Sequence, residues 1–553
     1  MKIKLLFVAL LLSSIIIAQN NNNFELSKNL EIYGDIMRKL NLQYADDINP
    51  GDLTKTAIDA MLQQLDPYTV YVPESKLEDF ELMTKGEYGG IGALIQKQGD
   101  YVVITEPYEG FPAQKSGLKP GDRIVEIGGE SAIGKTSSQI SEKLKGVPGS
   151  VLKIKTIPFN DTLVTEHELV REKIKFPNIP YSGMLDKQIG YISLSQFNPN
   201  SAADVKNAFL ELKKNKDLKG LILDLRNNGG GLLNEAVDIV NTFVPKGETI
   251  VITKGKLKKS TMIHKTKSAA LDKKIPVVVL VNENTASASE IVSGSLQDLD
   301  RAVIIGQKTF GKGLVQNILM LPYNSKLKIT VAKYYIPSGR CIQAIDYFEP
   351  GNNGDDGKIP DSVLSVFKTR GGREVFDGAG IFPDISIRPE LFSQISADLY
   401  AGNYIFNFAN AFFAGHDSIS KAKDFSIDDE TYNKFKESVE EQGFDYLTET
   451  ETILDRMQKS AEREHYLDAI SAEIDQLKES IKMEKKKDID KFRTEIEEML
   501  RIEIISRYYY QKGKIIASLQ NDKEVKKAID VLNDTELYHS ILKGTYKETE
   551  TKE

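Results

Sequence analysis

Short apolar runs alternate with amphipathic runs between residues 188 and 388, and this alternation constrains the fold more than any other feature of the chain. The apolar runs are typical of buried strands, and the amphipathic runs have helical spacing. Strands are expected at 189–194, 220–225, 275–281 and 302–306, and helices at 202–214, 232–243 and 287–296. Because strand–helix units repeat, the region is predicted to form a mainly parallel α/β core.

The other regions differ in character, as expected for 553 residues at about 150 residues per domain. Helical spacing runs through residues 24–85, where Pro67 ends the second helix. Gly-rich turns separate short β-rich runs through 86–175, with a short helix at 139–144. The α/β core is assigned to 176–390 and a charged helical domain to 391–553. A multidomain α+β protein is therefore predicted.

The C-terminal region carries apolar residues at alternating three- and four-residue steps, the spacing of a coiled-coil seam. The seam consists of Leu467, Ile470, Ile474, Leu477 and Ile481. Its register breaks at Glu484, so a helical hairpin or bundle is expected rather than a long rod. This pattern favours a packing role, or a homodimer formed through the terminal helical segments, over a catalytic role.

The first 18 residues have the pattern of a secretory signal peptide. Lys2 and Lys4 precede an uncharged, mostly apolar stretch that ends at Ala18, and this stretch is shorter than a bilayer crossing requires. Cleavage after Ala18 would release an exported, soluble or loosely membrane-associated protein. An uncleaved membrane anchor is the alternative.

Composition excludes several classes of function. A net charge of -8, from 72 basic and 80 acidic residues, argues against a general nucleic-acid binder. Cys341 is the sole cysteine, and the five histidines are scattered without metal-ligand spacing. Neither a disulfide framework nor a protein-built metal site is expected.

Ser287 occupies the most informative position in the sequence, because it lies where a buried strand passes through a loop of small residues into a helix. A serine at such a junction is exposed on a rigid element, beside free N–H groups of the first helical turn that could stabilise an oxyanion. The alternative is a serine that only caps the helix. The triple glycine at 229–231 follows another core strand, and one of its N–H groups could supply a second oxyanion donor.

A lysine is the stronger candidate for the base. His264 lies in a Lys-rich polar segment with no evident acidic partner, whereas Lys312 stands between two glycines beside Phe310 and other apolar residues. Burial lowers the pKa of a lysine, which makes a neutral amine available near pH 7. Gln316 is close enough in sequence to hold that amine. An exposed structural lysine is the alternative.

A second candidate site lies in residues 88–93, YGGIGA. Backbone N–H groups at Gly89, Gly90, Ile91 and Gly92 can form a nest for a carboxylate, and a following strand could accept an extended peptide by β-augmentation.

Several sequence blocks together resemble those of the carboxy-terminal processing peptidases, also called tail-specific proteases. The blocks are TASASE at 285–290, GKGLVQ at 311–316, DLRNNGGG at 224–231, KYYIPSGRCIQ at 333–343 and GIFPDI at 380–385. The stretch SGLKPGDRIVEIGGES at 116–131 resembles the PDZ domain of that family. The resemblance covers roughly residues 24–388 and implies a ClpP/crotonase-like protease core with an inserted PDZ domain.

The resemblance implies a role for each matching residue. Ser287 would be the nucleophile, Lys312 the general base and Gln316 the residue that orients the lysine. The N–H groups of Ala288 and Gly230 would hold the oxyanion. The sequence departs from the family at position 229, where a glycine stands in place of a frequent proline.

The prediction is therefore a periplasmic serine endopeptidase that cleaves proteins near their C-termini, with the PDZ domain at 86–175 capturing the substrate tail. Protein substrates are its expected partners, and no metal or organic cofactor is implied. The alternative is a catalytically inert PDZ adaptor, against which the intact serine, lysine and glutamine argue.

Overall fold

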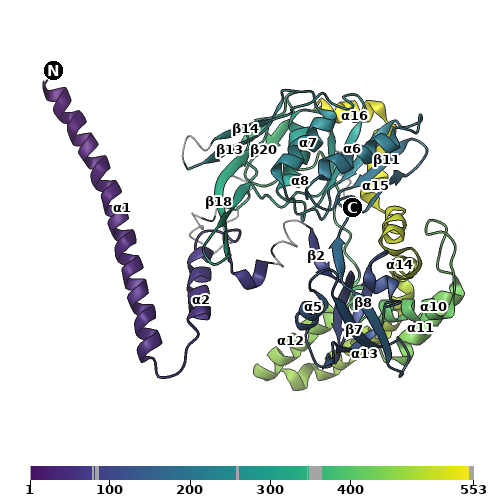
Figure 1. Ribbon diagram of the computed structural model, residues 1–553. Coiled ribbons are helices and arrows are strands. Elements are labelled where there is room, and N and C mark those ends of the chain that lie inside the picture. The colour runs from purple at the N-terminus through teal and green to yellow at the C-terminus, as the bar shows by residue number, and fades with distance from the viewer. Residues whose placement is uncertain are drawn as a thin grey trace. The chain divides into compact units, whose positions relative to one another are not determined.

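The computed structural model describes residues 2–77, 80, 86–256, 261–345, 347 and 364–546, with side chains from residue 23 onward (Figure 1). The chain divides into two compact units. One comprises Met1–Ser75 and Gln316–Thr330, and the other comprises Lys76–Val315 and Val331–Glu553.

The first unit begins with two helices, α1 (Lys2–Gln43) and α2 (Pro50–Gln63). The side chain of Asn49 caps α2 by accepting from the N–H groups of Gly51 and Asp52. After Pro67 the chain forms the short strand β1 (Val70–Val72), which pairs with Lys326–Lys328, and then a 3-10 turn at Glu74–Lys76. The second helix thus ends before Pro67, as the sequence predicts, but the segment assigned as helical also contains a strand.

The core of the second unit is a six-stranded sheet in the order β10-β11-β12-β15-β16-β21. Its strands are β10 (Tyr181–Met184), β11 (Ile189–Ser193), β12 (Gly220–Asp224), β15 (Val277–Val281), β16 (Val303–Gly306) and β21 (Ile385–Ser386). All neighbours pair in parallel except β10 with β11. The predicted mainly parallel core is confirmed, and the ends of β11, β12, β15 and β16 lie within two residues of those expected, whereas β10 and β21 were not expected.

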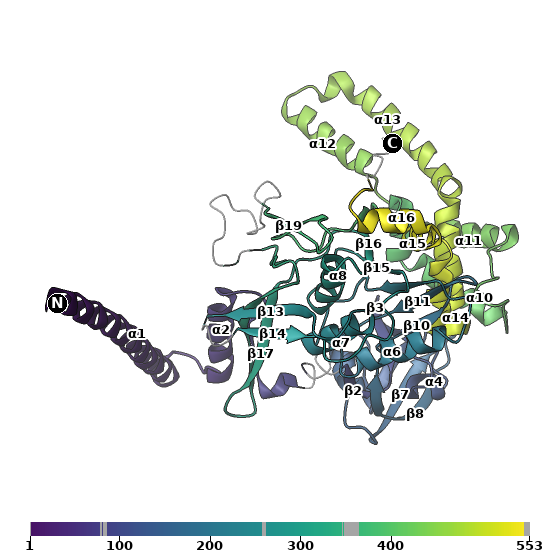
Figure 2. The same ribbon diagram turned by 90° about the horizontal axis from the view of Figure 1, so that it is seen from above.

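Helices cover both faces of this sheet. On one face α6 (Ser201–Leu212), α7 (Leu233–Phe243) and α8 (Ala288–Asp298) pack against alternate strand residues such as Leu223 and Val279. On the other face α15 (Lys523–Asn533) and α16 (Thr535–Leu542) pack against Ile222 and Val278 (Figure 2). The last two helices thus cover the core sheet, whereas the sequence pattern assigned them to a separate helical domain.

A long hairpin follows β16 along the chain. It consists of β17 (Leu314–Met320) and β18 (Lys326–Tyr335), and the end of β18 pairs with β13 (Thr249–Gly255). Strand β13 also pairs with β14 (Met262–Lys265). A small hairpin follows, formed by β19 (Val366–Lys368) and β20 (Glu374–Phe376).

Residues 86–175 form a separate β-domain. Its sheet has the order β3-β4-β5-β7-β8, with β6 paired to β5. The strands are β3 (Ala93–Gln98), β4 (Tyr101–Pro107), β5 (Arg123–Ile127), β6 (Glu130–Ser131), β7 (Val151–Ile157) and β8 (Thr165–Val170). Two more strands, β2 (Glu87–Gly90) and β9 (Glu172–Lys175), pair with each other, and the helices are α4 (Pro112–Lys115) and α5 (Ser137–Leu144). Strand β3 lies at the edge of the sheet and contacts α5.

The remaining helices form a bundle and a hairpin. The helical bundle consists of α9 (Gln394–Ala401), α10 (Tyr404–Gly415), α11 (Asp429–Glu441) and α14 (Arg493–Leu519), which share one apolar core. The hairpin consists of α12 (Glu449–Arg463) and α13 (Leu467–Lys491), which lie side by side in Figure 2. The predicted hairpin is confirmed, although α13 continues past Glu484.

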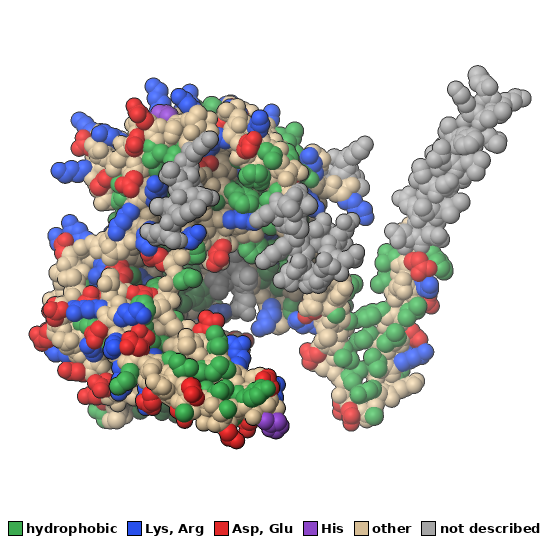
Figure 3. All heavy atoms as spheres, turned by 180° about the vertical axis from the view of Figure 1, so that it is seen from behind, with side chains coloured by type: hydrophobic (Ala, Val, Ile, Leu, Met, Phe, Trp, Pro, Cys, Tyr) green, Lys and Arg blue, Asp and Glu red, His purple; other side chains and the backbone are tan. Residues whose placement is uncertain are grey.

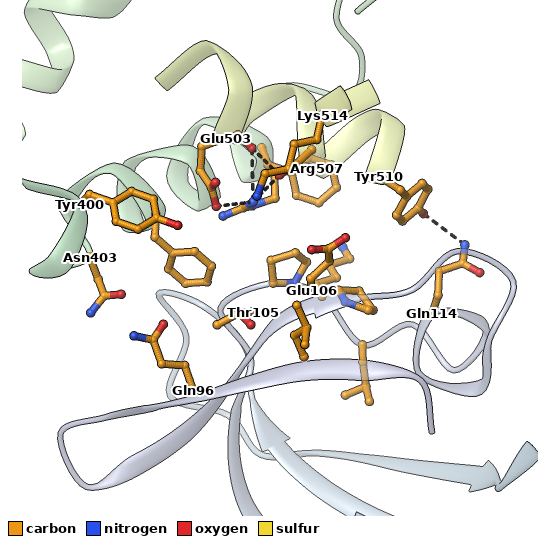
Figure 4. Close-up of a pocket in the computed structure, with 18 of the residues that line it drawn as sticks. Gln96, Thr105, Glu106, Gln114, Tyr400, Asn403, Glu503, Arg507, Tyr510 and Lys514 are labelled. Carbon is orange, nitrogen blue, oxygen red and sulfur yellow. Dashed lines mark hydrogen bonds and ion pairs between the residues drawn. The ribbon is translucent and has the colours of Figure 1, made fainter. Parts of the chain in front are cut away.

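The β-domain meets the helical bundle across a joint with several polar contacts. Gln511 donates to both carboxylate oxygens of Glu106 at 2.6 Å, and Gln114 donates to the hydroxyl of Tyr510 at 3.2 Å. A cavity of about 400 Å³ lies between the two domains, and in Figure 4 Glu106 faces Arg507 across it. Burial raises the pKa of Glu106. Polar joints of this kind separate more readily than an apolar core.

Two features are absent from the described part of the chain. No helix there combines the length and the hydropathy needed to cross a membrane. No group of three or more His, Cys, Asp and Glu side chains there is arranged to hold a metal ion.

The position of α16 predicts a specific loss of stability. The buried Tyr538 hydroxyl accepts from the Val277 N–H at 3.1 Å, and this bond attaches the C-terminal helix to the central strand β15. Tyr538→Phe deprives a buried N–H of this acceptor, so we expect the free energy of unfolding to fall by about 1–3 kcal/mol. Unfolding of the variant and the wild type in urea measures this difference in free energy. Replacement of the exposed Tyr400 by Phe is the control and should change nothing measurable.

Candidate active site

Ser287 adopts a strained backbone conformation at the junction of β15 and α8. Its φ of 58° and ψ of -115° lie outside the regions that a serine normally occupies. The Thr285 side chain fixes the preceding turn by donating to the Leu225 carbonyl at 2.9 Å. A strained residue held by its surroundings at a strand-to-helix turn is how a nucleophile elbow presents its side chain.

The glycine-rich loop packs directly against this turn. The carbonyl oxygen of Asn228 accepts from the Ala286 N–H at 3.0 Å and from the Ser289 hydroxyl at 2.9 Å. A Cβ atom at Gly230 would lie only 2.8 Å from the Ala288 nitrogen and from the Ser287 Cβ. Only glycine therefore fits at position 230, which also has a φ of 96°.

The two N–H groups expected to stabilise an oxyanion differ in whether they already donate a hydrogen bond. The Ala288 N–H is at the first position of α8 and makes no hydrogen bond within the described residues. The Gly230 N–H donates to the side-chain oxygen of Asn228 at 2.9 Å. The first donor is thus available, whereas a substrate oxygen would have to compete with Asn228 for the second.

The buried carboxylate of Glu290 joins the serine loop to the lysine loop. One oxygen accepts from the N–H groups of Ser287 at 2.7 Å and Lys312 at 2.9 Å. The other accepts from the Thr309 hydroxyl at 2.6 Å and the Gly311 N–H at 2.7 Å. Burial raises the pKa of Glu290 to about 6, even though these four hydrogen bonds favour the charged form.

Tyr334 joins the same two loops from another side. Its hydroxyl lies 3.1 Å from the carbonyl oxygen of Ser287 and also contacts the carbonyl oxygen of Lys312. The Phe310 N–H donates to the Thr285 carbonyl at 3.0 Å, which adds a direct backbone link. The half-buried Lys312 is therefore carried by a loop that is fixed to the serine loop at several points.

Gln316 and His264, the other side chains considered for a catalytic role, both lie on strands. Gln316 is on β17 in the other compact unit, where its amide donates to the Thr330 hydroxyl at 3.3 Å. His264 is on β14, and burial together with the nearby Lys267 lowers its pKa.

The proposed carboxylate nest divides between a strand and a turn. Gly89 and Gly90 belong to β2 and pair with β9, whereas Ile91 and Gly92 connect β2 to the edge strand β3. Within the described residues, the N–H groups of Ile91 and Gly92 make no hydrogen bond. A Cβ atom at Gly89 would lie 2.0 Å from the Gly146 carbonyl oxygen, so the loop after α5 requires a glycine there.

Sequence reasoning did not identify Glu290, Tyr334 or Asn228. Glu290 follows Ser287 by three positions, the spacing of a capping box, and that signal could have revealed it. The carbonyl of Asn228 and the hydroxyl of Tyr334 act through contacts between distant segments, which no local pattern indicates.

The fold and site together define a candidate hydrolase core beside a separate β-domain, and three family models match the chain. Peptidase family S41 matches residues 188–350, the PDZ domain matches 103–157, and the probable PDZ-protease C-terminal helical domain matches 395–532.

Similarity to curated proteins establishes the family of this chain. The carboxy-terminal-processing protease of Bartonella bacilliformis is 36% identical over 339 residues, which are 60% of this chain and 77% of that protein. The probable CtpA-like serine protease of Staphylococcus aureus is 35% identical over 318 residues, which are 57% of this chain and 62% of that protein's length. The chain belongs to the carboxy-terminal-processing protease family, with a PDZ domain and a C-terminal helical domain.

Solved structures of similar proteins include the photosystem II D1 C-terminal processing protease, which is 28% identical, with 65% of this chain and 87% of that chain covered at a TM-score of 0.36. The PDZ domain of the carboxy-terminal protease from Vibrio cholerae, solved with a peptide, is 31% identical. It covers 16% of this chain and 99% of its own, at a TM-score of 0.16.

Removing the charge of Glu290 should separate the two loops. In Glu290→Gln the amide nitrogen must face either the N–H groups of Ser287 and Lys312 or the Gly311 N–H beside the Thr309 hydroxyl, so at least one of the four hydrogen bonds is lost. We expect proteolytic activity to fall about 100-fold, the scale seen when a catalytic group is misplaced by about 1 Å. Cleavage assays on purified variant and wild type measure this, and activity equal to wild type would contradict it.

The same variant tests the pKa of Glu290. Because the folded pKa of about 6 lies above the ordinary value of 4.5, the folded state binds this proton more tightly than the unfolded state. This contribution to stability is fully present below pH 4.5 and is lost as the pH rises through 6, and the shift corresponds to about 2 kcal/mol. The stability difference between pH 4.5 and pH 7 should be altered by that amount in Glu290→Gln.

Gly230→Ala should abolish activity without unfolding the protein. The added methyl group would press on the Ala288 nitrogen and the Ser287 Cβ, so the loop must move away from the serine. Loss of one oxyanion donor alone costs about 10²–10³ in kcat. Gly229→Ala is the matched control, because a Cβ there meets nothing within 4 Å. Equal activities of the two variants would count against this role for Gly230.

Proposed function

We propose that this protein is an exported serine endopeptidase that cleaves proteins near their C-termini with a Ser287/Lys312 dyad. The observation that supports this most strongly is the Glu290 carboxylate, which binds the backbone N–H groups of both residues at 2.7 and 2.9 Å. This buried carboxylate holds the serine loop and the lysine loop in one arrangement. Nucleophilic catalysis requires such preorganisation.

The proposed reaction has two halves. The neutral amine of Lys312 takes the proton of Ser287 as its Oγ attacks the scissile carbonyl carbon, and the resulting oxyanion receives hydrogen bonds from the Ala288 and Gly230 N–H groups. The intermediate collapses as the C–N bond breaks, and Lys312 gives its proton to the leaving amine. Water then attacks the acyl-enzyme, Lys312 again accepts a proton, and serine is restored with release of a carboxylate.

Two family features complete the proposed active site. Gln316 orients the Lys312 amine from β17, and the core has the ClpP/crotonase-like architecture. Both rest on the resemblance of the sequence blocks, together with the mainly parallel sheet that delivers Ser287.

The PDZ domain is proposed to capture the substrate tail. The N–H groups of Ile91 and Gly92 are suited to a terminal carboxylate, with Gly89 and Gly90 shaping the approach. The tail would then pair with the edge strand β3 beside α5.

The terminal segments support a proposal for the location of the protein and for its assembly. We propose that residues 1–18 are a signal peptide and that the mature chain acts in the bacterial periplasm. Helix α1 exposes Leu26, Leu30 and Ile36 at 61%, 63% and 50%, and Figure 3 shows its apolar side chains uncovered. Burial of such a surface in a homodimer is favourable, so the N-terminal helices are the proposed contact.

The first experiment compares the chain from Gln19 with its Ser287→Ala and Lys312→Ala variants. Each is incubated with an unfolded protein that ends in an apolar tail, and with the same protein ending in charged residues. We expect fragments in mass spectrometry from the wild type only, with the apolar tail cleaved faster, because both dyad residues take part in bond breaking.

Tail binding by the Ser287→Ala variant is the control for folding and capture. Binding without cleavage by any form would favour the inert adaptor. Cleavage that survives Lys312→Ala would exclude the lysine as base and return His264 to consideration.

A further inference from the structure

The C-terminal helices reach the candidate active site through Arg226. This arginine lies in the turn after β12, where its N–H and Nε donate to the Asp224 carboxylate at 2.9 and 3.0 Å. A terminal nitrogen of the guanidinium contacts the same carboxylate at 2.6 Å, and the Tyr191 hydroxyl donates to it at 2.7 Å. Asp224 thus fixes both the backbone and the side chain of Arg226.

Two carboxylates from the start of α15 engage the other side of the guanidinium. Its second terminal nitrogen lies 2.7 Å from the Asp522 carboxylate and also contacts Glu524. All three side chains are largely buried, with 14–16% of their surface exposed. Ion pairs with this degree of burial need complete partners, because an isolated charge in such a place is costly.

The turn that carries Arg226 leads directly to the nucleophile. Two residues later, Asn228 accepts from the Ala286 N–H and the Ser289 hydroxyl, which flank Ser287 on both sides. The Asn228 side chain also holds the Gly230 N–H. A displacement of the Arg226 turn would therefore move both the serine loop and an oxyanion donor.

We propose that Asp522 and Glu524 are positioning residues for the protease reaction, acting through Arg226 to hold the glycine-rich loop against Ser287. This inference rests on the proposed function. It means that the helix covering the core sheet also completes the active site, even though neither carboxylate touches the substrate.

In this proposal the two acids act by holding the Arg226 side chain in one position. Without the two negative charges, the terminal nitrogen of Arg226 loses its ionic partners, and the guanidinium gains by turning toward water. That rotation weakens its paired bonds to Asp224, and these bonds set the direction of the chain toward Asn228. The effect should appear in the chemical step and leave tail capture in the PDZ domain unchanged.

The test uses the full chain with Asp522→Asn and Glu524→Gln combined, and Asp530→Asn as the control. Asp530 lies on the same helix with its side chain exposed, so it undergoes the same chemical change away from Arg226. We expect kcat to fall about 10- to 100-fold with KM for the tail-bearing substrate changed less than about twofold. Unchanged kcat, or a rise in KM alone, would overturn the proposal.

A double-mutant cycle with Arg226→Lys asks whether the acids act through the arginine. Lysine keeps the charge but not the paired geometry, so the combined variant should lose hardly more activity than Arg226→Lys alone. Fully additive losses would refute action through Arg226. The conservative Glu524→Asp should retain more activity than Glu524→Gln.

Hydrogen exchange followed by mass spectrometry supplies a readout that needs no turnover. The double variant should exchange faster at 225–231 and 286–290 than the wild type, with β3 and α5 unchanged. Equal exchange at those loops would contradict the inference. If the wild type shows no Ser287-dependent cleavage, the proposed function fails, while the exchange result still decides whether the acids hold the loop.

Discussion

The Glu290 carboxylate is the interaction on which the candidate site depends. Four donors from two loops converge on its two oxygens, and the loops follow different strands of the core sheet. A carboxylate can satisfy this many donors only while it is charged, yet its burial opposes that charge and raises the pKa to about 6. The site is thus organised at the expense of stability near neutral pH, a compromise common where geometry serves chemistry.

Two kinds of contact hold the domains of the second unit together. The last helices are attached to the core by apolar packing and by buried partners such as Tyr538 and Arg226, so core and C-terminus behave as one body. The PDZ domain instead meets the helical bundle through polar contacts of Gln511 and Gln114 around a cavity with both polar and apolar lining. The C-terminal helices are thus attached to the core by a continuous apolar cluster, whereas the PDZ domain meets the bundle around a cavity.

The sequence predicted those features that depend on local pattern. Apolar runs identified β11, β12, β15 and β16 to within two residues but missed the short parallel strand β21, and small residues around Ser287 and Lys312 indicated the two loops. The docking of α15 and α16 on the sheet was missed, because an amphipathic pattern shows that a helix has an apolar face without showing what covers it. The bond between the Gly230 N–H and Asn228 was likewise hidden, since it depends on a turn whose shape is set by Asp224 and by neighbouring strands.

The placement of α15 and α16 also affects when a newly made chain can become a protease. Until residues 519–541 emerge from the ribosome, Ile222, Val278 and Leu280 have no cover on that face, and Arg226 lacks its two acids. Contacts between segments so far apart in sequence form late in folding. The Arg226 turn and the loop that carries Ser287 therefore reach the arrangement described here only after α15 and α16 have docked on the sheet.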